Sequence, residues 1–232
     1  MTISHPVKDS ETAAQLEALG YLERPSQPKY DRPLLVCDVD EVVLHLVAPF
    51  LTVLEETGFH LKRKSFKLTG NVFHKETGRE ATQGEIYARL DTIFSEQDRR
   101  QELVPGVMEA LTDLSNDIDI VFLTNMPHDY RLLRLQHLSN QSLDHPVITN
   151  TGSKVAAIHR MMAHHRGPVG FIDDTALNLS QVADVLPQVH LFHFMADDGF
   201  RQLSDPVPAA KISTGDWHEA KTSIREHLVN MS

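Results

Sequence analysis

The stretch from Leu34 to Val43 reads LLVCDVDEVV and decides the fold. Its first four residues form an apolar run, which then meets two acids, Asp38 and Asp40. A short apolar run that ends abruptly in polar residues is typical of a buried parallel strand, because such a strand delivers polar side chains at its carboxyl end. The stretch therefore predicts a central strand with a polar site directly after it.

Further apolar runs follow the same pattern along the chain. They are IDIVFL at 118–123, PVIT at 146–149, VGFI at 169–172 and VHLFHF at 189–194. The segments between them repeat apolar residues at helical spacing, as Leu132, Leu135 and Leu138 do. This alternation of strand and helix predicts an α/β fold, with a three-layer Rossmann-like parallel sheet that carries helices on both faces.

One segment interrupts the alternation directly after the first strand. Residues 45–103 contain a helix that stops at Gly58 and two strand patterns, SFKLT and VFHK, and the continuation of the second through Glu76, Thr77 and Gly78 predicts hairpin turns. A second helix then begins with the capping-box spacing of Thr82 and Glu85. We therefore expect a small α+β module inserted into a core domain made of residues 33–44 and 104–232.

The first 32 residues differ in character from the predicted core. Ser10 is placed to cap a short amphipathic helix that contains Leu16 and ends at Gly20. The stretch ERPSQPKYDRP follows and contains three prolines. Residues 1–32 are therefore predicted to form a peripheral N-terminal arm.

Composition excludes several functional classes. The 232 residues include 22 Lys and Arg against 32 Asp and Glu, which gives a formal charge of −10 and disfavours nucleic-acid and anionic-membrane partners. Cys37 is the only cysteine, so no disulfide can form within the chain. No apolar stretch approaches the roughly 20 residues of a membrane helix, and the N-terminus lacks the order of a signal peptide. We expect a cytoplasmic protein with no nucleic-acid and no membrane partner.

Polar side chains collect at the carboxyl ends of the predicted strands, where ligands bind in open parallel sheets. These residues are Asp38, Asp40, Thr124, Asn125, Asp173 and Asp174, and Lys154 begins the helix that precedes the last pair. Four carboxylates in one crevice are costly unless a cation neutralises them. An all-oxygen set of ligands suits Mg²⁺, which binds through a few carboxylates together with a phosphate. The sequence therefore predicts a magnesium site at this edge.

The order of DVDEVV, VFLTN, Lys154 and FIDDT resembles the four motifs of the haloacid dehalogenase-like (HAD) superfamily, in its phosphatase branch. The resemblance covers about residues 34–195. A lone pair of acids is weak evidence, whereas four motifs in the correct order at strand ends are specific. The resemblance implies a Mg²⁺-dependent phosphohydrolase that acts on a small phosphorylated metabolite. It also implies that the inserted module, residues 45–103, is a cap over the active site.

The resemblance also assigns catalytic roles. Asp38 would be the nucleophile that attacks phosphorus and forms an aspartyl-phosphate. Asp40 would protonate the leaving alkoxide and then deprotonate the attacking water. Thr124 and the backbone of Asn125 would bind the transferring phosphoryl group, and Lys154 would neutralise its charge.

Metal ligands follow from the same resemblance. The set implied for Mg²⁺ is Asp38, the backbone carbonyl of Asp40, Asp173 and Asp174. Asp174 would bind the metal directly, and Asp173 would act in the outer sphere.

Two features leave alternatives open. Glu41 stands where the family pattern DxDGT has glycine, and it adds an acid beside the predicted site. A HAD-like binding or regulatory protein with weakened catalysis is therefore an alternative, as is a phosphotransferase or phosphomutase. In the inserted module, LKRKSFK at 61–67 is either a surface that attracts an anionic substrate or a solvated strand.

Overall fold

Six parallel strands form the central sheet in the order β5-β4-β1-β6-β7-β8. Their bounds are β1 Leu34–Cys37, β4 Asp119–Asn125, β5 Val147–Asn150, β6 Val169–Asp173, β7 His190–Phe194 and β8 Ala210–Thr214. The structure, a computed structural model, describes residues 6–21, 23 and 25–230. The predicted α/β parallel sheet is confirmed, and β1 lies near its middle, between β4 and β6.

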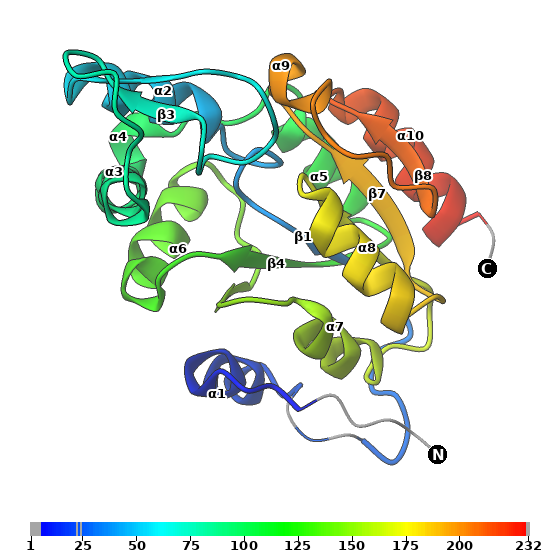
Figure 1. Ribbon diagram of the computed structural model, residues 1–232. Coiled ribbons are helices and arrows are strands. Elements are labelled where there is room, and N and C mark those ends of the chain that lie inside the picture. Colours follow the sequence, from blue (N-terminus) through cyan, green and yellow to red (C-terminus); the bar gives the residue numbers. More distant parts are fainter. Residues whose placement is uncertain (1–5, 22, 24, 231–232) are drawn as a thin grey trace.

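Helices cover both faces of this sheet (Figure 1). One buried cluster joins the sheet to α5 (Val107–Leu114), α6 (Arg131–Asn140) and α10 (Trp217–Leu228). A second cluster joins the other face to α1 (Ser10–Ala18), α7 (Val155–Met162) and α8 (Ala176–Val185). In the described part of the chain, no helix is both long enough and apolar enough to cross a membrane.

The segment between β1 and α5 forms a small unit with its own hydrophobic cluster. Its elements are α2 (Val47–Glu56), β2 (Phe59–Leu61), β3 (Val72–His74), α3 (Gln83–Ser95) and α4 (Gln97–Arg100). The predicted capping box is present, because Thr82 accepts a hydrogen bond from the Glu85 backbone and the Glu85 side chain binds back to the Thr82 backbone. The unit is therefore α+β, and it follows β1 directly along the chain.

One predicted strand of this unit is wrong. SFKLT was expected to be a strand, but β3 pairs with β2, which lies before that stretch. Residues 62–71 form a loop instead, and the buried Asn71 holds it. The Asn71 side-chain amide donates to the backbone carbonyls of Ser65 and Lys67 at 3.1 and 2.6 Å. A loop closed by a side chain leaves no periodic pattern in the sequence.

The first helix is part of the core packing rather than peripheral. Leu16 of α1 is fully buried in the cluster beneath α7. Thr12 donates to the backbone carbonyl of Thr149 in β5, and Gln15 accepts from the backbone amide of the same residue at 2.8 Å. The N-cap is Asp9, whose side chain accepts from two backbone amides, and not Ser10 as expected.

Two short helices complete the fold. The 3-10 helix η1 spans His128–Tyr130, and α9 spans Asp198–Arg201 after β7. The sequence did not predict β8, because its side chains are half-buried or exposed apart from Thr214. An edge strand of this kind lacks the continuous apolar run that marks the central strands.

Candidate functional site

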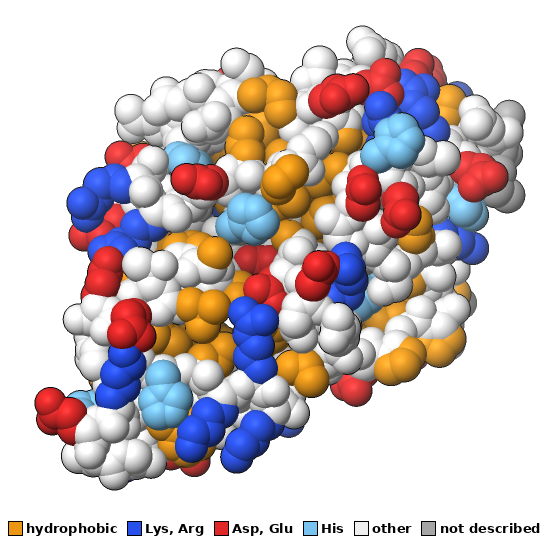
Figure 2. All heavy atoms as spheres, turned by 90° about the horizontal axis from the view of Figure 1, so that it is seen from above, with side chains coloured by type: hydrophobic (Ala, Val, Ile, Leu, Met, Phe, Trp, Pro, Cys, Tyr) orange, Lys and Arg blue, Asp and Glu red, His pale blue; other side chains and the backbone are white. Residues whose placement is uncertain are grey.

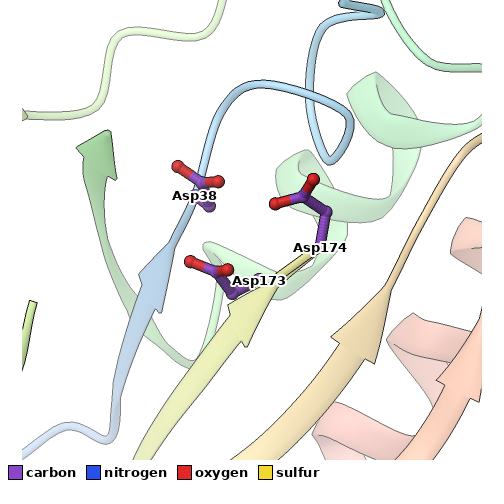
Figure 3. Close-up of side chains that lie close together, drawn as sticks. All are labelled: Asp38, Asp173 and Asp174. Carbon is purple, nitrogen blue, oxygen red and sulfur yellow. The ribbon is translucent and has the colours of Figure 1, made fainter. Parts of the chain in front are cut away.

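A buried ion-pair cluster lies at the carboxyl ends of β1 and β6. The Lys154 ammonium is 2.7 Å from Asp38 Oδ1 and 2.7 Å from Asp173 Oδ2. Figure 3 shows Asp38, Asp173 and Asp174 with their carboxylates close together. All three side chains come from positions that the sequence analysis named.

The local fold explains why these residues meet. Cys37 of β1 and Ile172 of β6 are partners in the parallel ladder, and the Asp38 amide donates to the Ile172 carbonyl at 3.0 Å. Asp38, directly after β1, and Asp173, the last residue of β6, therefore lie at the same level of neighbouring strands. Lys154 arrives from the loop after β5, where it is the N-cap of α7. Its side chain is 1% exposed, so the two carboxylates replace the water that an ammonium needs.

Burial and crowding set the electrostatics of this cluster. Loss of water raises the pKa of Asp38 to about 7, helped by Asp173 and Asp40 and opposed by Lys154. Burial, Asp173 and Asp38 raise the pKa of Asp174 well above its ordinary value. Burial alone would lower the pKa of Lys154, but Asp173 and Asp38 outweigh it and raise that pKa. The ammonium is thus held in its charged form, but its single positive charge does not balance the negative charge of the carboxylates around it.

The chemistry of the donors fits a hard divalent cation. Carboxylate oxygens of Asp38, Asp173 and Asp174 all lie within 4.8 Å of one another. Three carboxylates against one ammonium leave an excess of negative charge, which a cation with oxygen ligands neutralises. Mg²⁺ is therefore consistent with the residues present.

Within this cluster, both carboxylate oxygens of Asp173 already contact donors of the protein itself. Its Oδ1 accepts from the Thr175 amide at 2.9 Å and from Asn178 Nδ2 at 3.0 Å, and its Oδ2 meets Lys154. The Asp174 carboxylate has one described hydrogen bond, from the Thr175 hydroxyl. Asp174 and Asp38 therefore have more free oxygen lone pairs to offer a metal than Asp173 has.

Asp40 lies in the same crevice but belongs to a different network. Its Oδ1 accepts from Gln101 Nε2 at 2.8 Å and from Arg134 at 3.1 Å. Its Oδ2 accepts from the Thr124 hydroxyl at 3.2 Å. The Asp40 carboxylate is absent from the three-carboxylate group, so of this residue only the backbone carbonyl remains as a metal ligand candidate.

Arg134, which contacts Asp40, was not predicted from the sequence. It is fully buried, and besides Asp40 it donates to Gln97 Oε1 at 2.5 Å and to Gln101 Oε1 at 3.0 Å. Both glutamines come from the end of the inserted segment, so the network joins that segment to α6 and β1. No local signal distinguishes Arg134 from the neighbouring Arg131, because burial of one polar helix position depends on tertiary contacts.

Glu41 does not face the site. Its backbone has a left-handed conformation with φ of 63°, as the glycine of the family pattern would allow. Its Oε1 accepts from the amides of Leu46 and Val47 at 2.6 and 2.5 Å, and its Oε2 accepts from the Asp197 amide. The carboxylate therefore caps α2 and adds no charge to the crevice.

A cavity of about 710 Å³ opens over the cluster. The core contributes Asp38, Asp40, Thr124, Asn125, Met126, Pro127, Asn150, Thr151, Lys154, Asp174, Thr175 and Asn178. The inserted segment contributes Leu46, Leu68, Tyr87, Leu90, Asp91 and Phe94. In the space-filling view of Figure 2, hydrophobic and acidic side chains lie next to one another around the hollowed middle of the face that it shows.

The basic stretch LKRKSFK contributes no residue to the lining of this cavity. Arg63 donates to Asp197 Oδ2 at 3.2 Å, and its guanidinium lies 5.5 Å from the Phe200 ring. Phe66 meets the same ring edge-on, with centroids 5.9 Å apart. The stretch therefore joins the inserted segment to α9, and none of Lys62, Lys64 and Lys67 lines the cavity.

Comparison with known proteins identifies the class of fold. No protein-family model matches the chain, and no curated protein matches its sequence. Solved structures do match. A HAD family hydrolase from Deinococcus radiodurans R1, with bound phosphate and sodium, aligns with a TM-score of 0.55 and 14% identity, over 86% of this chain and 97% of that one.

Two further solved structures agree with this match. A predicted phosphoglycolate phosphatase from Haemophilus somnus aligns with a TM-score of 0.54 and 13% identity, over 82% of this chain and 96% of its own. A protein proposed to be a β-phosphoglucomutase from Thermotoga maritima aligns with a TM-score of 0.54 and 15% identity, over 84% and 100%. The chain therefore has the fold of haloacid dehalogenase-like hydrolases, and the resemblance in the motifs is confirmed at the level of the fold.

Proposed function

We propose that the protein is a Mg²⁺-dependent phosphohydrolase that acts on a small phosphomonoester through an aspartyl-phosphate on Asp38. The observation that carries the proposal is the position of Asp38 on the floor of a cavity, 2.7 Å from a buried ammonium and beside Asp174. An attacking carboxylate needs open space in front of it and positive charge beside it. Both conditions are met at Asp38.

In the proposed reaction, an oxygen of Asp38 attacks phosphorus, and the bond from phosphorus to the ester oxygen breaks. Asp40 gives a proton to the departing alkoxide and later takes one from the water that hydrolyses the aspartyl-phosphate. Thr124 and the Asn125 backbone bind the phosphoryl oxygens, and Lys154 neutralises their charge. Arg134 and Gln101 hold the Asp40 carboxylate in a fixed orientation.

Mg²⁺ would be held by Asp38, Asp174 and the Asp40 carbonyl, with Asp173 acting through Lys154 and Asn178. Bound there, the ion supplies charge neutralisation at the carboxylates and at the phosphoryl group. We further propose that residues 45–103 act as a cap on a core of residues 33–44 and 104–232. Six of the residues that line the cavity lie in that segment.

The test is Mg²⁺-dependent release of phosphate from a generic aryl phosphate, with Asp38→Asn as the paired variant. We expect activity in the parent protein, loss with chelator, and a fall of at least about 1,000-fold in Asp38→Asn. Activity that survives Asp38→Asn, or no activity at all, overturns the proposal.

Two alternatives predict different results. A phosphotransferase or phosphomutase would show a long-lived aspartyl-phosphate with little release, and one structural neighbour is proposed to be a mutase. A binding or regulatory protein would bind phosphate esters without turnover. Its only support was an acid at Glu41, and that side chain caps α2 and does not line the cavity.

A further inference from the structure

The cavity over Asp38 has two walls of different character. The core wall is polar and carries the carboxylate cluster. The wall from the inserted segment is built from hydrophobic side chains, which are Leu46, Leu68, Tyr87, Leu90 and Phe94. Hydrophobic side chains at this position face the group that would leave from the phosphate, because the phosphate itself must lie at Asp38.

Acidic side chains also outnumber basic ones in the lining of the cavity. Lys154 is the only basic residue among its lining residues in the described chain, and two carboxylates already neutralise it. The inserted segment adds one charged side chain, Asp91. Tyr130 donates to Asp91 Oδ1 at 2.5 Å, so this carboxylate is held in place while its other oxygen remains available.

These two observations restrict the leaving group. A hydrophobic wall stabilises an apolar group by removing it from water, and it offers nothing to a polar sugar. A second anionic group on the substrate would meet Asp91 and find no free cation. None of the basic side chains of the inserted stretch 61–67 lines the cavity, and Arg63 pairs with Asp197.

We infer that the site takes a phosphomonoester of a hydrophobic alcohol that carries no second negative charge, with Asp91 excluding anionic alcohols and accepting cationic ones. This inference rests on the proposed phosphohydrolase function, and it names the class of substrate. Leu90 and Asp91 are then residues that determine specificity, and they do not take part in the chemistry. The preference is expected in binding as well as in turnover, since both walls act before any bond breaks.

The test uses three para-substituted phenyl phosphates whose short side chains end in a methyl, an ammonium or a carboxylate group. Two methylenes separate the charge from the ring, so the leaving groups have nearly equal acidity. A fourth phenyl phosphate, whose side chain ends in a glycol group, is the polar comparison and is called the glycol ester. We expect kcat/KM for the methyl and ammonium esters to exceed that of the carboxylate ester and of the glycol ester by about 10-fold or more.

Two variants assign the preference to its residues. Asp91→Asn should reduce the ratio of ammonium to carboxylate ester by about 3-fold or more. Leu90→Ser should reduce the ratio of methyl to glycol ester by a similar factor, without changing the charge ratio. Asp205→Asn, an exposed acid outside the cavity lining, is the matched control and should change neither ratio.

Calorimetric binding of the same esters to Asp38→Asn separates this inference from the proposed function. Ranked binding without turnover in the parent protein supports the substrate class and overturns the phosphohydrolase. Turnover in which the carboxylate or glycol ester is used equally well overturns the substrate class and leaves the phosphohydrolase standing. Ratios that Asp91→Asn and Leu90→Ser leave unchanged also overturn it, and an absence of both binding and turnover overturns both.

Discussion

Replacing Lys154 with methionine tests whether one buried ammonium holds the carboxylate cluster together. The side chain is 1% exposed and contacts Asp38 and Asp173 at 2.7 Å each. Methionine has a similar unbranched shape and can fill the same space without charge. The variant therefore removes the counter-charge and leaves most of the packing in place.

The magnitude follows from the two contacts. At 2.7 Å, each ion pair has a gross attraction of about 6 kcal/mol for an effective dielectric constant of about 20. The cost of burying the ammonium offsets much of this, and removing one partner of a buried pair typically costs about 3–5 kcal/mol. Without metal, we expect the free energy of unfolding of Lys154→Met to be about 3–5 kcal/mol lower than that of the parent protein at about pH 8.

The loss should depend on pH with a definite sign. The pKa of Asp38 is about 7 in the folded chain against an ordinary value of 3.8, so the folded state binds the proton more tightly. Stability is therefore lost as the pH rises through the window from about 4 to about 7. A protonated carboxylate needs no counter-charge, so the effect of Lys154→Met should shrink as the pH falls below about 7.

Urea unfolding in chelator, followed through the fluorescence of Trp217, measures both effects. Lys67→Met, at an exposed lysine, is the control and should stay within about 0.5 kcal/mol of the parent protein. A loss of less than about 1 kcal/mol near pH 8, or a loss that is equal at both ends of the pH window, would refute the reasoning.

Four further variants at three positions are tested by urea unfolding, which is followed by circular dichroism because Trp217→Phe removes the single tryptophan of the chain. Asp38→Asn should raise metal-free stability near about pH 8, by on the order of 2 kcal/mol, and flatten its dependence between about pH 4 and 7; a decrease would contradict the raised pKa. Glu41→Ala should cost about 1 kcal/mol more than Glu41→Gly, because both lose the cap of α2 but only alanine keeps a strained left-handed backbone. Trp217→Phe should cost about 1–3 kcal/mol, because the Val42 carbonyl loses the indole donor at 2.8 Å.

The sheet and the central cluster were predictable because their signals are local. Apolar runs marked five of the six strands, two of these runs end in acids, and parallel topology placed Asp38 and Asp173 together. Lys154 was expected at the same site from the motif order, and its ammonium lies 2.7 Å from each of these two carboxylates.

The missed features all depend on contacts between distant segments. Arg134 differs from its helix neighbours only through its contacts with Gln97 of α4 and with Gln101, which directly follows α4. Glu41 was expected to add a negative charge beside the site. Only the fold reveals that its carboxylate accepts hydrogen bonds from two backbone amides at the start of α2. The roles of individual site residues, and the boundaries of cap and core, stay predictions until the variants are measured.

The packing of α1 against β5 has a consequence for the behaviour of the protein in solution. β5 is the last strand on its side of the sheet, and the outer amide and carbonyl of Thr149 are bonded to Gln15 and Thr12. An uncovered outer strand is a template on which another chain can add a strand. Helix α1 therefore protects the protein from edge-to-edge aggregation, and a shortened chain that lacks it would expose the backbone of β5 to pairing with other chains.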